Sequence, residues 1–137
     1  QLLKLARSLG VDDRLSIVGH LRDMPAIMML SDAVISCSEK PEAFGRIILE
    51  AQAMGRPVIA FNHGGAIELV KNNENGLLVD KGDVDGLAQC LLEVISMNIK
   101  QRKELTIRSI KNVSNLYLTS QMCQKYIELY KEVLNKF

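Results

Sequence analysis

The sequence has little that would mark a metalloprotein, a redox protein or a membrane protein. Its three cysteines, Cys37, Cys90 and Cys123, are far apart and form no C-x-x-C pair, which excludes the usual zinc and redox motifs. Because they are embedded in apolar segments, we expect them to be buried and reduced. The longest apolar runs, such as residues 26–30, are too short to span a bilayer, and no N-terminal stretch resembles a signal peptide.

A large excess of charge is also absent. The 17 basic and 16 acidic residues leave a net charge of +1, too little to attract nucleic acid. The charge is unevenly placed, because residues 98–137 carry a net +5 and residues 1–97 a net −4. A basic C-terminal part suits an anionic lipid surface or an acidic partner, although the solvated side of two helices is the commoner cause.

What is present fits one α/β domain. The 137 residues, 47% of them hydrophobic, suffice for one buried core. Short apolar strands are predicted at residues 15–18, 33–36, 57–61 and 76–79, and they alternate with helices. This alternation predicts a Rossmann-like parallel sheet with helices on both faces. Such sheets bind ligands at the carboxyl ends of their strands.

The helices begin and end at recognisable residues. Asp23 and Asp83 are expected as N-caps, and a helix is expected from about Phe44 to Met54. Two helices without any strand signal follow, near residues 99–116 and 119–137, the second with Thr119 or Ser120 as its cap. That last helix carries an apolar stripe at helical spacing, formed by Cys123, Tyr126, Ile127, Tyr130, Val133, Leu134 and Phe137.

The segment from residue 41 to 50 carries the strongest functional signal. Gly45 stands at a helix start, whose free N–H groups form an anion site that suits a diphosphate. Glu50 lies about 7–8 Å further along the helix axis, roughly the distance from a diphosphate to its ribose. Glu42 lies on the other side of the phosphate site, where a donor sugar would be. A competing interpretation is that the helix dipole stabilises Glu42 and that Glu50 pairs with Arg46.

These residues belong to a longer pattern. It comprises EAFGRIILEAQAMGRPVIA at residues 42–60, GGAIE at 64–68 and NGLLV at 75–79, with LGVDDRLSIVG upstream at 9–19. The pattern resembles family 4 glycosyltransferases, which are retaining enzymes of the two-domain GT-B fold with an E-x7-E motif. The resemblance is close over residues 2 to 95 and looser in the last two helices.

The resemblance assigns roles to individual residues. Glu42 would contact the donor sugar as the catalytic position, and Glu50 would hold the ribose hydroxyls. The other nucleotide-sugar contacts would come from the amides of Phe44, Gly45 and Arg46, from Gly19 and His20 beside the base, and from Gly64 and Gly65 at the floor. His20 and His63 are more simply explained as loop histidines, and Arg46 is equally well explained as a helix-surface charge.

The function implied by the resemblance is hexosyl transfer from a nucleoside-diphosphate sugar to a glycan or lipid. The expected setting is envelope polysaccharide or lipopolysaccharide synthesis in the cytoplasm or at the inner face of the membrane, with peripheral membrane association of the parent enzyme. No cofactor is expected beyond the donor substrate, and no metal, because Asp80, Asp83 and Asp85 lack a matching histidine. The alternatives are a non-catalytic nucleotide-sugar-binding remnant and, less well suited to the glutamate pair, a sugar-nucleotide epimerase.

The resemblance also predicts the domain organisation. Residues 1–137 would form a single truncated donor-binding domain, and residues 119–137 a helix that in family members crosses to an N-terminal acceptor-binding domain. The family's upstream Arg and Lys, which hold the diphosphate, have no counterpart in this sequence. We therefore expect the isolated chain to be inactive. We expect its last helix to be displaced, frayed or buried in a homodimer, unless it folds onto its own domain.

Overall fold

The computed structural model describes residues 1–136. Its centre is a three-stranded parallel sheet in the order β1-β2-β3. The strands are β1 (Val34–Ser36), β2 (Val58–Phe61) and β3 (Leu77–Val79), at three of the four positions expected from the sequence. Because all three run in the same direction, the loops that follow β1 and β2 emerge at one edge of the sheet.

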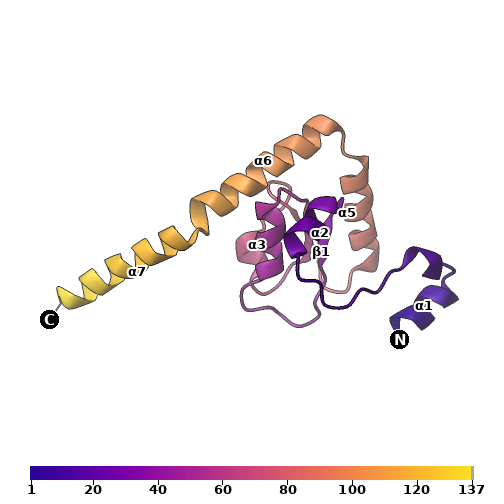
Figure 1. The fold of residues 1–137 in the computed structure, drawn as a ribbon, viewed down its shortest axis with the longest axis horizontal. Coiled ribbons are helices and arrows are strands. Elements are labelled where there is room, and N and C mark those ends of the chain that lie inside the picture. The colour runs from indigo at the N-terminus through magenta and orange to yellow at the C-terminus, as the bar shows by residue number, and fades with distance from the viewer. Residues whose placement is uncertain (137) are drawn as a thin grey trace.

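Helices cover both faces of this sheet. Alternate residues of β2 face two hydrophobic clusters, with Val58 and Ala60 in one and Ile59 in the other. Helix α3 (Arg46–Ala53) packs on the first face and α5 (Val84–Ser96) on the second. The expected α/β class is therefore confirmed. The other helices are α1 (Leu2–Ser8), the short 3-10 helix η1 (Asp12–Arg14), α2 (Met24–Leu30), α4 (Ala66–Leu69), α6 (Ile99–Leu116) and α7 (Thr119–Leu134), as Figure 1 shows.

The strand expected at residues 15–18 is wrong. The segment has no regular secondary structure, and Leu15, Ile17 and Val18 are exposed. A strand needs a neighbour that pairs with its N–H and C=O groups, and none of residues 1–136 pairs with this segment. An apolar pattern alone therefore does not make it a strand.

Two of the helix starts follow the sequence, and a third differs. Asp23 and Asp83 accept hydrogen bonds from the amides three residues on, at 3.1 and 2.8 Å, so both expected N-caps are confirmed. Helix α7 is capped by neither Thr119 nor Ser120. Its N-cap is Leu118, whose N–H donates to the side chain of Gln121 at 3.2 Å. The Gln121 amide also donates to the last carbonyls of α6, so one side chain joins the two helix ends.

The cysteines are less buried than expected. Cys37 and Cys123 are exposed, because one lies in the loop after β1 and the other on α7, while Cys90 is half-buried on α5. Burial raises the pKa of the Cys90 thiol, and the carboxylates of Glu93 and Asp83 raise it further.

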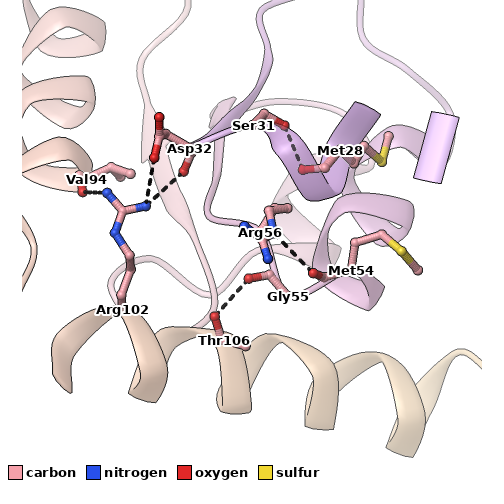
Figure 2. Close-up of polar contacts among 9 residues, drawn as sticks. All are labelled: Met28, Ser31, Asp32, Met54, Gly55, Arg56, Val94, Arg102 and Thr106. Atoms are coloured by element: carbon pink, nitrogen blue, oxygen red, sulfur yellow. Dashed lines mark hydrogen bonds and ion pairs between the residues drawn. The ribbon is translucent and has the colours of Figure 1, made fainter. Parts of the chain in front are cut away.

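Helix α6 braces the helix that carries the site. The two helices α3 and α6 share the most extensive helix–helix contact of the described chain. Thr106 donates to the Gly55 carbonyl at 2.8 Å, just beyond the end of α3. Arg102 donates to the Val94 carbonyl at 2.9 Å and lies 3.6 Å from the Asp32 carboxylate (Figure 2). These contacts fix α6 against α3, α5 and the start of β1.

Helix α7 extends away from the rest of the molecule (Figure 1). None of its residues is buried, and its apolar stripe is exposed from Cys123 to Leu134. Phe137, the last member of the expected stripe, lies outside the described residues. None of the described helices has the length and apolar character to cross a membrane.

An exposed stripe of this kind predicts self-association. We expect the average mass from light scattering to rise with protein concentration, and trypsin to cut at Lys125 and Lys131 when the protein is dilute. Replacing Tyr126 and Tyr130 with lysine should hold the chain monomeric, because charge disfavours burial of the stripe. A strictly monomeric wild-type chain with a trypsin-resistant C-terminus would contradict this prediction.

Candidate functional site

The start of α3 is open to a ligand. Gly45 is its N-cap, with a φ of 90° that favours glycine, and no side chain caps the helix. A Cβ at Gly45 would also lie 3.2 Å from side-chain atoms of both Ile48 and Leu69. Uncapped N–H groups with the positive end of the helix dipole suit an anion. The ligand contacts expected from the amides of Phe44, Gly45 and Arg46 stay a prediction.

Glu42 lies on one side of this helix start. It lines a small pocket of about 10 Å³ together with Ser36, Ser38, Lys40, Gly45, Ile48, Phe61, His63 and Ala66. Its Oε2 is 3.8 Å from the place that a Cβ on Gly45 would take, so the carboxylate lies close to the N-cap residue of α3. The pocket is nearly filled, so a ligand larger than a water molecule would lie at its mouth.

Glu50 lies on another side of α3, in a separate groove of about 420 Å³. Its lining is mostly apolar but also includes Arg22 and Arg46. The other lining residues are Met24, Pro25, Met28, Ala53 and Met54. Glu50 accepts a hydrogen bond from Arg46 at 3.1 Å. The Arg46 side chain is 83% exposed, so this pair contributes little to stability and either partner can turn to a ligand.

The two glycines after β2 pack beneath the Glu42 loop. A Cβ on Gly64 would lie 2.7 Å from the Glu42 carbonyl oxygen, and one on Gly65 would collide with the Phe44 carbonyl. The Gly65 N–H also donates to the Glu42 carbonyl at 2.8 Å. The absence of side chains at these two glycines therefore lets their backbone pack directly against the backbone of the Glu42 loop.

The structure does not bring every predicted site residue together. Gly19 and His20 lie in the exposed segment before α2, and no atom lies within 4 Å of a Cβ built on Gly19. Of this stretch, Arg22 is the residue that lines the Glu50 groove. The roles of Gly19 and His20 beside a base stay predictions.

The sequence analysis did not identify most of the residues that line the Glu42 pocket and the Glu50 groove, nor the buried side-chain amide of Gln52. Ser36 and Ser38 could have been noticed, because they end and follow β1 on the ligand edge of the sheet. Gln52, two residues after Glu50, is fully buried and gives no signal in the sequence. Within residues 1–136 no group of three or more His, Cys, Asp or Glu side chains could hold a metal ion.

Comparison with known proteins adds to this geometry. The family model described as glycosyl transferases group 1 matches residues 1–112. The chain is 31% identical over 129 residues to the lipopolysaccharide core biosynthesis glycosyltransferase LpsE of Rhizobium meliloti, covering 93% of this chain and 37% of that protein. It is 27% identical over 133 residues to the N-acetyl-alpha-D-glucosaminyl L-malate synthase of Bacillus anthracis, covering 97% and 34%.

A solved structure gives the same picture. The crystal structure of HepE from Anabaena in complex with UDP matches with a TM-score of 0.90 and 30% identity, covering 96% of this chain and 36% of that one. HepE is also solved with UDP-glucose. The chain thus spans about a third of the length of these relatives.

Proposed function

The chain belongs to the glycosyl transferases group 1 family, and we propose that it is the donor-binding domain of a retaining hexosyltransferase. The substrate class is a nucleoside-diphosphate sugar, and the acceptor is a glycan or lipid. The observation that carries the proposal is the placement of Glu42 and Glu50 on two sides of the uncapped start of α3. The UDP and UDP-glucose complexes of HepE support this class of ligand.

The chemistry at this site is electrostatic. As the bond between the sugar and the diphosphate breaks, negative charge grows on the leaving diphosphate, and the free amides at Gly45 and Arg46 stabilise it. Glu50, once released from Arg46, accepts hydrogen bonds from the ribose hydroxyls, and Glu42 accepts them from the donor sugar. We assign no general base to the described residues.

The wider role follows from the relatives. LpsE acts, by its name, in lipopolysaccharide core biosynthesis, and envelope polysaccharide or lipopolysaccharide synthesis on the cytoplasmic side is therefore the setting that we propose. In a complete enzyme an N-terminal domain would bind the acceptor and would supply further cations for the diphosphate. Peripheral association of that enzyme with the membrane belongs to the same proposal.

Substitution of the two glutamates, one at a time, tests this assignment. Wild-type chain should bind UDP, GDP or ADP weakly in calorimetry, at roughly −4 to −6 kcal/mol, because only part of the diphosphate site is present. Glu50→Gln should weaken the preferred nucleotide about tenfold, since a charged acceptor for the ribose is lost. Glu42→Gln should leave nucleotide affinity unchanged and remove the added affinity of the nucleotide sugar.

Glu132→Gln is the matched control, because Glu132 is an exposed glutamate on α7, outside the site. It should bind as the wild type does. If Glu42→Gln abolished nucleotide binding while Glu50→Gln did not, the two roles would be reversed.

A further inference from the structure

His63 follows β2 and stands between the two loops of the site. Its ring Nε2 lies 2.9 Å from the carbonyl oxygen of Ser38, in the loop that carries Glu42. Its Nδ1 is buried and has no hydrogen-bond partner among the described residues. Because a carbonyl oxygen can only accept, Nε2 carries a proton, and Nδ1 is the ring nitrogen that is left without a partner.

The two ring nitrogens of His63 are used differently. Buried polar side-chain atoms are nearly always paired, yet His63 leaves one ring nitrogen unpaired and uses the other to hold Ser38. Within residues 1–136 this is the only side-chain hydrogen bond between the loop at 37–45 and the loop at 62–65. The backbone bond from Gly65 to the Glu42 carbonyl is the other tie between them.

The two carboxylates of the site are held by different means. Glu50 belongs to α3, which α6 braces from behind. Glu42 belongs to a loop without regular secondary structure, and the loop's position depends on contacts such as that from His63. Loss of the ring should therefore disturb Glu42 and leave Glu50 in place.

We propose that His63 is a positioning residue, which holds the Glu42 loop through its Nε2–H bond to Ser38 and thereby favours nucleotides that carry a sugar. The final step, the preference for a sugar-bearing nucleotide, rests on the proposed function. The holding of the loop does not.

The tautomer can be read directly by NMR. The chain has two histidines, so a long-range proton–nitrogen spectrum of the wild type at alkaline pH contains two rings, and His20→Gln identifies the signals of His63. We expect a protonated Nε2 and an unprotonated Nδ1 for His63. The opposite tautomer would overturn the inference, because Nε2 could not then donate to Ser38.

Two substitutions separate positioning from packing. A glutamine can place its amide nitrogen near the position of Nε2, whereas the shorter asparagine reaches only the position of Nδ1. His63→Asn should speed hydrogen exchange of the Gly65 amide, which donates to the Glu42 carbonyl, about tenfold, because loss of one hydrogen bond lets the two loops separate more often. His63→Gln should restore slow exchange. Equal exchange in the two variants would overturn the inference.

The same variants are then titrated with ligands. UDP is compared with UDP-glucose, and GDP with GDP-mannose, to measure how much the sugar adds to affinity. His63→Asn should lose this gain and keep the affinity for the nucleotide, while His63→Gln keeps both. An equal loss of nucleotide affinity would mean general damage and would overturn the positioning role. If the wild-type chain binds no nucleotide, the proposed function fails, and the NMR and exchange results still decide whether His63 holds the loop.

Discussion

Gly65→Ala is expected to destabilise the chain by about 3 kcal/mol, toward the upper end of the range for overpacking. The backbone of Gly65 has a φ of −62°, which alanine adopts freely, so the cost is steric. A Cβ at this position would lie 2.6 Å from the carbonyl carbon of Phe44 and 2.9 Å from its Cα. These are backbone atoms, which cannot rotate out of the way as a side chain can.

Gly65→Ala should also weaken the binding of a nucleotide sugar. To admit the methyl group, the loop from Glu42 to Phe44 must move away from Gly65, which breaks the Gly65 N–H bond to the Glu42 carbonyl. Urea unfolding measures the loss of stability, and titration with a nucleotide sugar measures the loss of binding.

Gly19→Ala is the matched control for this substitution. A Cβ on Gly19 would meet no atom within 4 Å, and its φ is not in the left-handed region. The urea midpoint of this variant should stay at the wild-type value. A Gly65→Ala chain as stable as Gly19→Ala would show that the two loops do not pack as closely as described.

Gln52→Ala is expected to cost about 3 kcal/mol, because it combines a cavity with a broken polar network. Gln52 is fully buried on α3. Its amide donates to the carbonyls of Leu69 and Asn75 at 3.2 and 3.3 Å, and its carbonyl accepts from Asn112 of α6 at 3.3 Å. Ser109 of α6 donates to the same Asn75 carbonyl at 3.1 Å.

A double-mutant cycle isolates the polar part of this effect. Gln52→Leu keeps most of the volume but leaves the Asn112 amide without its partner, so it should still destabilise measurably in urea. Adding Asn112→Leu should recover part of that loss. Gln89→Ala, at an exposed glutamine of α5, is the control and should change stability by less than about 0.5 kcal/mol. Strict additivity of the two leucine substitutions would contradict the network.

The site could be predicted in part because its signals are local in sequence. A glycine before an amphipathic helix, with a glutamate on each side, predicts an anion site flanked by carboxylates, and α3 has that form. The sequence left two alternatives for Glu50, and the structure contains the pair with Arg46 without excluding the ligand role. The sequence could not predict that Glu42 lines a pocket and Glu50 a separate groove. Residues far from both glutamates in the sequence, such as Arg22 and His63, help to line these two sites.

By itself the sequence determined the α/β class, the three paired strands and the helix starts at Asp23 and Asp83, because periodicity and capping depend on residues a few positions apart. The tertiary structure alone decided that residues 15–18 stay unpaired, that Gln52 is buried and that Gly65 meets the backbone of Phe44. Strand pairing, burial and close backbone approach are contacts between segments far apart in the chain. They are fixed only once the segments have packed together.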